Sequence, residues 1–422
     1  MSCALLDIND CNVQLWHDQQ HVQSPGYALL AGNNYRFGNE ARAQARLQPR
    51  NINTRFWSQL NTHPLQPALG PARHTADLVH AHLLALHHAA GAPEEVFMAV
   101  PATFEREQLA LLLGIIEQCP FKVVGLFNRS VALSLTTPQT GTDSLYHLEI
   151  QLHQAVLNEL GSNTGERSLL ASHNLPGCGL LALQEKLIEV VANTFIRQTR
   201  FDPRRKAASE QHLYNALPQA LRELDKRSEV RIEVDGYSAR IGSEALASAN
   251  QFLFKAVHEQ LAGQRANLLA QPLLGLLPGA TEALPGLRIL TPDSLIQTVA
   301  NQQSQLRSED ALSLISHLPL PVTDNSDVPH HATAPSSPAP GTSADLQPTH
   351  LLQGFCARPL VVAGTPIGSD WQLYREGDNW QLRGPADINV SINGLPYAGQ
   401  ALRCGDSLAL AGNLAGVLIE VC

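Results

Sequence analysis

Arg129 stands at a point in the sequence where a carboxylate would be useful for chemistry. The apolar run VFMAV ends at Pro101, an amphipathic segment follows, and a second apolar run, KVVGLF, leads into the segment NRSVALSL. This order suits an α/β fold that handles a nucleotide. A guanidinium stays protonated and accepts no hydrogen bond, so Arg129 cannot act as a base there.

The other residue types that could carry out chemistry lack the partners they would need. Seventeen histidines include a group in residues 74–88, but no spacing is that of a zinc site with carboxylate or Cys partners. We expect those histidines to lie on a solvated helix face. Cys178 has no base placed beside it, and Ser130 lies outside the G-x-S-x-G pattern of a hydrolase. The sequence therefore predicts no metal site and no catalytic residue.

The composition excludes several classes of protein. Hydrophobic residues make up 44% of the chain, charged residues 16%, and the formal net charge is −9. A nucleic-acid-binding protein would usually show a basic excess. Seven Cys form no CxxC, which is typical of free thiols in a reducing compartment. No signal-peptide pattern opens the chain, and no apolar run approaches the roughly 18 residues that cross a bilayer. We therefore expect a cytoplasmic protein without a membrane span or a nucleic-acid partner.

Three parts follow one another along the chain. Residues 1–305 carry long periodic segments, with no evident internal repeat. Residues 306–349 are predicted to be a Pro/Ser-rich linker, because residues 322–349 hold five Pro, no aromatic residue and a single Leu. The coil reach of such a stretch is roughly 30 Å. Residues 350–422 contain short apolar runs separated by turn signals, which predicts a small all-β sandwich.

The first part alternates between strand and helix patterns. Apolar runs predict buried strands at residues 96–100 and 122–127, and amphipathic spacing predicts helices at residues 104–119, 180–199 and 208–228. Alternating residues predict hairpins at residues 147–160 and 231–241, the second of which turns on Asp235 and Gly236. These elements predict an α/β class.

This order of elements resembles the nucleotide-binding domain of the seventy-kilodalton heat-shock chaperones, in the actin-like ATPase superfamily. The segment from VPATF to NRSVALSL resembles that family's Val-Pro-Ala strand end, helix, strand and Asn-Glu-Pro-Thr-Ala-Ala-Ala-Leu. GCGLLALQEKL resembles its Gly-Gly-Asp segment and long helix, and LLPGATEALPG its late Val-Gly-Gly-Ser turn. The resemblance covers residues 3–300. It implies an actin-like two-lobed fold with ribonuclease-H-like βββαβαβα lobes.

The two phosphate-binding hairpins of the family are altered in this chain. Where the family has Asp-Leu-Gly-Thr-Thr, the sequence reads Asp7-Ile8-Asn9-Asp10-Cys11, so Asp7 remains but Asn9 replaces the glycine and Asp10 adds a carboxylate. Where the family has Asp-Leu-Gly-Gly-Gly-Thr, the sequence reads HLEIQLH, from His147 through Glu149 to residue 153. Without glycines the backbone amides cannot wrap a phosphate.

Two further positions depart from the family. Arg129 aligns with the Glu that orients the attacking water, and Pro278-Gly279 replaces Gly-Gly in the adenosine turn. We expect ATP hydrolysis to be lost. We expect seven residues to form a vestigial nucleotide cleft: Asp7, Asn9, Asp10, Arg129, His147, Glu149 and Gly279. Arg129 would then either fill the vacated space and pair with Asp7, Asp10 or Glu149, or point to solvent at the start of a helix.

The last part of the chain resembles a forkhead-associated domain in its second half, where Asn-Gly, Gly-Asp and a closing strand recur. Phosphothreonine recognition in that family uses an Arg after an early Gly and a Ser-x-x-His. The corresponding segment VVAGTPIGSDWQ has neither. Charge-assisted donors are needed to hold a phosphate. We therefore expect the β-sandwich without its phosphate grip, or a β-sandwich of another type.

The resemblance implies a heat-shock-chaperone-like pseudo-ATPase. From residue 306 onward we expect a linker and a small β-sandwich in place of the chaperone family's peptide-binding domain and lid. We expect a protein-interaction scaffold that binds a protein partner through the two-lobed domain and the C-terminal β module, with no cofactor. One alternative is a divergent chaperone-type ATPase that still binds ATP and Mg²⁺ through Asp7 and Gly279. A second is an actin-like filament-forming protein.

Overall fold

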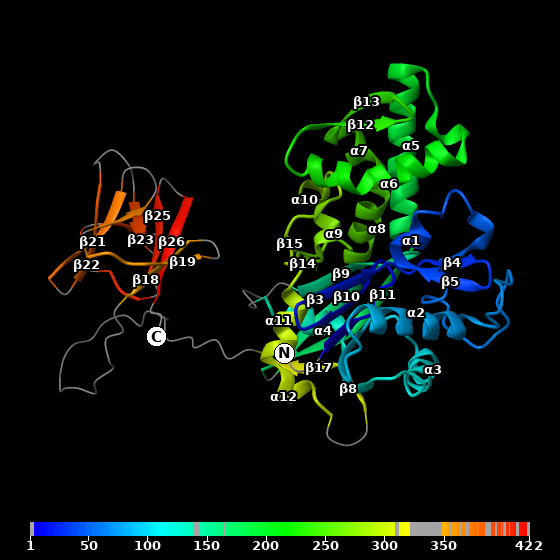
Figure 1. The fold of residues 1–422 in the computed structure, drawn as a ribbon, viewed down its shortest axis with the longest axis horizontal. Coiled ribbons are helices and arrows are strands. Elements are labelled where there is room, and N and C mark those ends of the chain that lie inside the picture. Colours follow the sequence, from blue (N-terminus) through cyan, green and yellow to red (C-terminus); the bar gives the residue numbers. More distant parts are fainter. Residues whose placement is uncertain are drawn as a thin grey trace. The chain divides into compact units, whose positions relative to one another are not determined.

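The computed structural model describes residues 4–137, 144–163, 165–308, 312–320 and 348–353, with shorter stretches between residues 356 and 419. The chain forms two compact units, residues 1–324 and 325–422 (Figure 1). Most of the predicted linker, residues 321–347, lies outside the described residues.

Two six-stranded sheets form the centre of the first unit. The strands of the first sheet are β1 (Ala4–Asp7), β2 (Val13–His17), β3 (Gln20–Ser24), β7 (Glu95–Val100), β8 (Lys122–Asn128) and β16 (Leu314–Ile315). Those of the second are β9 (Ser144–Ile150), β10 (Gln154–Asn163), β11 (Glu166–Pro176), β14 (Ala266–Ala270), β15 (Leu287–Ile289) and β17 (His317–Pro319). A small sheet of β4 (Ala28–Ala31), β5 (Asn34–Phe37) and β6 (Ile52–Asn53) accompanies the first.

The two large sheets repeat one strand order. Apart from β16, which adjoins β8, the first sheet runs β3-β2-β1-β7-β8. Apart from β17, which adjoins β11, the second runs β11-β10-β9-β14-β15. In the first sheet, β1 pairs antiparallel with β2 and parallel with β7. In the second, β9 pairs antiparallel with β10 and parallel with β14. The first unit therefore contains the same strand arrangement twice, a repeat that the sequence does not reveal. The predicted α/β class is confirmed.

Helices cover each sheet because their apolar positions recur every three or four residues. α2 (Thr75–Ala89) and α3 (Arg106–Ile116) share a hydrophobic cluster with the first sheet, and α5 (Leu180–Thr199), α6 (Ala207–Leu224) and α8 (Gln251–Leu261) share one with the second (Figure 1). In α5, Leu183, Leu187 and Val191 are fully buried at a spacing of four. The helix predicted at residues 180–199 is confirmed.

One short helix lies between the two sheets. α4 (Arg129–Ser134) contacts β8 of the first sheet and both β10 and β11 of the second. All of its residues are buried. A third hydrophobic cluster, which includes Phe97, Val131, Leu145 and Leu269, joins the two sheets around it. Arg129, the first residue of α4, therefore has no access to water.

The remaining helices and one hairpin complete the first unit. The helices are α1 (Gly38–Arg42), α7 (Ser243–Ala247), α9 (Pro272–Gly275), α10 (Ala280–Ala283), α11 (Ser294–Asn301) and α12 (Gln303–Leu306). The predicted hairpin is formed by β12 (Glu229–Val234) and β13 (Tyr237–Gly242). It turns through Asp235 at φ +51° and Gly236 at φ +81°, as an Asp-Gly turn requires.

The first unit extends beyond the boundary expected at residue 305. β16 pairs in parallel with β8, and β17 pairs antiparallel with β11. Both are very short and stand outside the periodic part of the sequence. Each gains its structure from a sheet edge built by distant residues, so local pattern could not locate it.

The second unit consists of two sheets around one core. Its strands are β18 (His350–Gln353), β19 (Cys356–Pro359), β20 (Thr365–Ile367), β21 (Trp371–Glu376), β22 (Asn379–Arg383), β23 (Val390–Ile392), β24 (Leu395–Pro396), β25 (Ser407–Leu410) and β26 (Asn413–Ile419). Three of them, β20, β21 and β22, form one sheet, and the other six form the second. Buried side chains of both sheets, such as Leu351 and Leu373, belong to one cluster.

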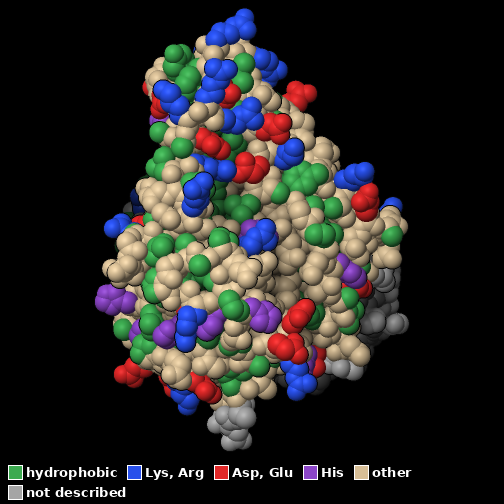
Figure 2. All heavy atoms as spheres, turned by 90° about the vertical axis from the view of Figure 1, so that its right-hand side faces the viewer, with side chains coloured by type: hydrophobic (Ala, Val, Ile, Leu, Met, Phe, Trp, Pro, Cys, Tyr) green, Lys and Arg blue, Asp and Glu red, His purple; other side chains and the backbone are tan. Residues whose placement is uncertain are grey.

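Charge is unevenly distributed over the first unit. Lys and Arg side chains gather at the end where α5 finishes and the hairpin β12–β13 lies (Figure 2). The exposed basic residues near that end include Arg197, Arg200, Arg204 and Arg205. The net charge of −9 thus arises from other parts of the chain. None of the helices described here has the length and apolar character needed to cross a bilayer.

Candidate functional site

Three charged side chains meet where the first strands of the two sheets end. Asp7 is the last residue of β1, Glu149 lies near the end of β9, and Arg129 is the first residue of α4. The side-chain oxygen of Asn128 accepts hydrogen bonds from two backbone N–H groups of α4 at 3.0 and 3.1 Å. This N-cap fixes the position at which Arg129 begins the helix.

The guanidinium of Arg129 lies between the two carboxylates. Its Nε donates to Oδ1 of Asp7 at 2.7 Å, and its Nη2 donates to Oδ2 at 2.9 Å. Its Nη1 lies 2.8 Å from Oε2 of Glu149 and forms an ion pair with it. Arg129 and Asp7 are 0% exposed and Glu149 is 1% exposed. Of the two interpretations open from the sequence, the buried pair is therefore confirmed for Asp7 and Glu149.

The environment keeps this arginine charged. Burial lowers the pKa of Arg129, but the carboxylates of Asp7 and Glu149 raise it, and the net shift is upward. Glu149 receives further hydrogen bonds through Oε1, from Nε2 of Gln151 at 3.0 Å and from Nδ2 of Asn9 at 3.5 Å. A buried ion pair needs such additional donors to offset desolvation.

The loops after β1 and β9 are joined directly to each other. Oδ1 of Asp10 accepts the backbone N–H of Leu152 at 2.7 Å, and Nδ2 of Asn9 donates to the carbonyl of Ile150 at 3.1 Å. Asp10 therefore does not pair with Arg129. Oδ1 of Asn9 accepts the N–H of Cys11 at 2.9 Å. Amides that could have surrounded a phosphate are thus used within the protein.

Asp10 sits in an environment that favours its neutral form. The pKa of Asp10 is raised to about 7, mainly by burial; the N–H of Leu152 lowers it and the nearby charge of Glu149 raises it, and both effects are smaller than that of burial. The side chain is 6% exposed. A second carboxylate next to Glu149 is tolerated here because it can hold a proton near neutral pH.

The start of α5 is also occupied by protein atoms. The N–H groups of Leu180 and Leu181 donate to the carbonyls of Gln151 and Leu152, at 2.9 and 3.0 Å. A Cβ at Gly179 would lie 2.4 Å from the backbone of residues 153 and 154, so only glycine permits this approach. The first amides of a helix can hold an anion, but these two amides hold the hairpin between β9 and β10 instead.

His147 belongs to a chain of buried polar groups behind the ion pair. Its Nδ1 lies 2.8 Å from Oγ of Ser130, which also accepts Nδ2 of Asn158 at 3.0 Å. Oγ of Ser172 donates to Oδ1 of Asn158 at 2.7 Å. Burial lowers the pKa of His147 to about 3, with a smaller contribution from Arg129. The imidazole is therefore neutral at physiological pH.

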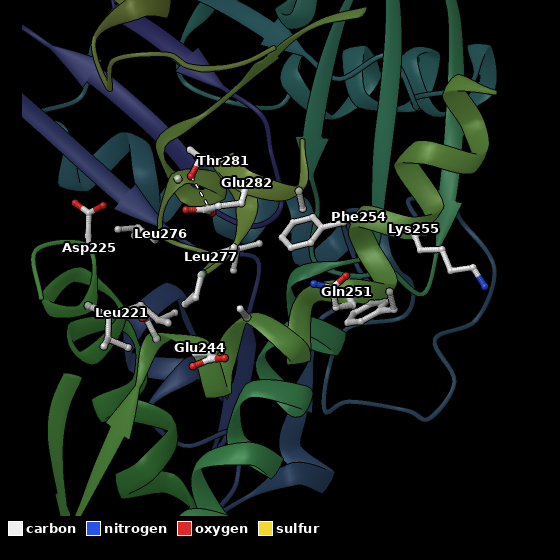
Figure 3. Close-up of a pocket in the computed structure, with 18 of the residues that line it drawn as sticks. Leu221, Asp225, Glu244, Gln251, Phe254, Lys255, Leu276, Leu277, Thr281 and Glu282 are labelled. Atoms are coloured by element: carbon white, nitrogen blue, oxygen red, sulfur yellow. Dashed lines mark hydrogen bonds between the residues drawn. The ribbon is translucent and has the colours of Figure 1, made fainter. Parts of the chain in front are cut away.

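Gly279, the last of the predicted cleft residues, lies apart from the others. It is in the turn before α10, and it lines an open groove of about 1180 Å³ between α6, α7, α8 and α10 (Figure 3). None of Asp7, Asn9, Asp10, Arg129, His147 and Glu149 lines that groove. A smaller cavity of about 240 Å³ opens beside Asp7 and Arg129 instead. The structure thus brings together six of the seven predicted residues.

The residues at this site do not fit a magnesium–phosphate group. Arg129 already occupies the carboxylate oxygens of Asp7, and the hairpin amides already have partners within the protein. Within the described part of the chain, no group of three or more His, Cys, Asp or Glu side chains could hold a metal ion. The arrangement is suited to holding the two sheets together.

Sequence reasoning missed the polar contacts around the ion pair and misplaced two histidines. His82 and His87 are buried, at 0% and 6% exposure, and do not lie on a solvated face. His82 accepts Nε1 of Trp57 at 3.0 Å and contacts Oγ of Ser24 at 2.7 Å, whereas Nε2 of His87 lies 2.9 Å from the carbonyl of Pro93. The residues that His82 and His87 contact are distant in the sequence or lie in irregular segments. Helical spacing alone therefore could not predict that these two histidines are buried.

No protein-family model matches the chain, and a search of curated proteins also finds no match.

Proposed function

We propose that this protein is an actin-like, heat-shock-chaperone-related scaffold whose nucleotide cleft has become a structural core. The repeated strand order of the two sheets supports the actin-like part of the proposal, since two ribonuclease-H-like lobes would each have this order. The meeting of Asp7 and Glu149 at the ends of β1 and β9 also supports it, because the resemblance places the phosphate hairpins at these two strand ends.

Loss of ATP hydrolysis rests on one observation above the others, the position of Arg129. It lies within 3 Å of both carboxylates, where the related ATPases would need a hydrated metal ion and a residue that orients water. A buried cation at this point repels Mg²⁺ and offers no acceptor to a water molecule. The internal hydrogen bonds of the hairpin amides work in the same direction.

A protein that has lost ATP hydrolysis would act through its surfaces instead. Residues 350–422 would provide a second interaction module, a forkhead-associated-like β-sandwich without the phosphate grip. Two modules on one chain raise the effective concentration for a bivalent partner. We propose a cytoplasmic protein-interaction scaffold that needs no cofactor.

ATP turnover by the purified full-length chain tests this proposal. We expect no magnesium-dependent phosphate release above the buffer background. A magnesium-dependent rate that stays constant per mole of chain through successive purification steps would show a divergent ATPase. Nucleotide-dependent sedimentation of large assemblies would instead point to an actin-like filament, and either result would overturn the scaffold proposal.

A further inference from the structure

The groove that contains Gly279 is separate from the ion-pair site, whose residues do not line it. Its volume is about 1180 Å³. Pockets for small molecules typically measure about 300–1,000 Å³ and enclose their ligands. This groove is open to solvent, and Figure 3 shows residues that line it. Its dimensions suit a segment of polypeptide better than a small molecule.

The floor of the groove is apolar. Leu221, Leu224, Phe254 and Leu277 line it and are at least nine-tenths buried. Leu276 also lines the groove and is partly exposed. Contact with apolar side chains would remove this surface from water and so stabilise a complex.

Three unpaired carboxylates stand around these leucines. Asp225, Glu244 and Glu282 are exposed, and none of them forms an ion pair with any residue that the structure describes. Figure 3 shows them on different sides of Leu276 and Leu277. Among the residues that the structure describes, these carboxylates form one hydrogen bond, in which Glu282 accepts the hydroxyl of Thr281 at 3.0 Å.

The basic side chains near the groove do not neutralise this rim. Nζ of Lys255 lies 3.7 Å from Oε1 of Glu259, and the side chain extends away from the leucines in Figure 3. Nε2 of His258 lies 2.7 Å from the carbonyl of Ala283, so this ring is engaged with the protein. The groove therefore combines an apolar floor with a net negative rim.

Gly279 shapes one wall of the groove. Its φ of +84° lies in the left-handed region, and a Cβ there would be 3.1 Å from Cβ of Ala247 in α7. The carbonyl of Pro278 accepts Nδ2 of Asn250 at 3.0 Å. The turn is thus held against the segment between α7 and α8, which sets the groove in a fixed form before any partner arrives.

We propose that this groove binds a cationic amphipathic helix of a partner protein. Apolar side chains on one face of the helix would contact Leu276 and the floor, and Lys or Arg side chains beside that face would pair with Asp225, Glu244 and Glu282. Laying the apolar face of a helix into a groove is a common mode of recognition. Charge complementarity across the rim would set specificity and the rate of association. The inference rests on the proposed function, because it names a surface that an interaction scaffold would use.

Binding of synthetic helices to the full-length chain tests the inference. The probe is a fluorescein-labelled peptide of roughly 18 residues, about five helical turns, with Leu on one face and Lys on its flanks. One control peptide carries Glu in place of Lys, and another has the same composition in an order without an amphipathic face. Fluorescence anisotropy gives the Kd for each. We expect binding of the cationic amphipathic peptide alone.

A pair of matched variants separates the groove from the general negative charge of the chain. The groove variant is Asp225→Asn/Glu244→Gln/Glu282→Gln. The control variant is Glu94→Gln/Glu107→Gln/Glu117→Gln, three exposed carboxylates on other surfaces that form no ion pair with the described residues. Both change the net charge by the same amount. We expect the groove variant to weaken binding by roughly tenfold, because three rim ion pairs are lost, and the control variant to leave it within about twofold.

Three results would overturn the inference. These are absence of binding by the cationic peptide, equal weakening in both variants, and equal binding of the peptide without an amphipathic face. Conversion of a self-associated wild-type chain into monomers by the groove variant alone would overturn it as well, because the occupant would be a second copy. None of these outcomes depends on ATP turnover, so failure of this inference and failure of the proposed function are distinguishable.

Discussion

The guanidinium of Arg129 meets the carboxylate of Asp7 side by side, with Nε 2.7 Å from Oδ1 and Nη2 2.9 Å from Oδ2. This fork geometry leaves Nη1 to face Glu149 from the second sheet. One arginine therefore connects the ends of β1 and β9 through a helix that contacts both sheets. The pairing holds the two sheets together at the ends of these strands.

Removal of Arg129 should destabilise the first unit strongly. Arg129→Ala leaves two buried carboxylates uncompensated, which typically costs about 3–5 kcal/mol. At roughly 2 °C for each kcal/mol in a domain of this size, the Tm should fall by several degrees. Arg129→Glu should be worse, because it adds a carboxylate to the site. It should not create an ATP site, since the hairpin amides keep their internal partners.

Arg106→Ala is the matched control for this measurement, because Arg106 also begins a helix but is exposed. We expect it to change stability by no more than about 0.5 kcal/mol. Near-neutral effects of both Arg129 substitutions in urea unfolding would contradict the account of the buried ion pair.

Asp10→Asn should stabilise the protein at high pH. In the folded chain the pKa of Asp10 is raised to about 7 from 3.8. Its contribution to stability is therefore present below pH 3.8 and is lost as the pH rises through 7. Asn has the shape of the neutral acid and cannot ionise. At pH 8 we expect a gain of a few kcal/mol, because each pH unit between the unfolded and folded pKa values corresponds to about 1.4 kcal/mol.

The gain from Asp10→Asn should disappear below about pH 4, where the wild-type carboxyl is protonated in both the folded and the unfolded state. Glu94→Gln, at an exposed carboxylate, should show no such change with pH. Urea midpoints at pH 8 and pH 4 provide the comparison. An Asp10→Asn variant that loses stability at pH 8 would refute the raised pKa.

His147 should contribute to loss of stability in acid. Burial lowers the pKa of His147, like that of His82, to about 3 from 6.5. Only the unfolded chain binds these protons between those values, so the contribution of each to stability is present above pH 6.5 and is lost as the pH falls toward 3. The expected slope is about 1.4 kcal/mol per pH unit for each histidine. His147→Asn should therefore lose less stability between pH 7.5 and pH 5.

His88→Asn is the control for the acid response, because His88 is exposed on the same helix as His82. It should show the pH dependence of the wild type. If His147→Asn also follows the wild-type curve, then His147 is not held neutral in the fold.

Elements with strong local patterns could be predicted from the sequence. The apolar spacing of residues 180–199 matches α5, and the Asp235-Gly236 signal matches the turn of the hairpin β12–β13. The burial of Arg129 could be proposed because a resemblance placed it opposite two acidic hairpins. In each case the prediction depended on a local sequence pattern or on the charge of a single residue.

Other features depend on contacts that no local pattern contains. The strands β16 and β17 are defined only by the edges they pair with. The bond from Leu152 to Asp10 joins residues far apart in the chain. His87 is buried because the ring of Phe121, at the end of a loop, stacks on its imidazole with 5.2 Å between the ring centroids. Gly279 was grouped with the ion pair through the resemblance alone, and the fold separates them.

Calorimetric titration of the full-length chain with ATP in the presence of Mg²⁺ tests the central claim most directly, because it measures binding whether or not hydrolysis follows. The buried Arg129 and the occupied hairpin amides predict no heat beyond that of dilution, and an unchanged Tm in excess nucleotide. A saturable, magnesium-dependent heat with a defined stoichiometry would contradict the account, since it would require the cleft between Asp7 and Glu149 to remain a nucleotide site.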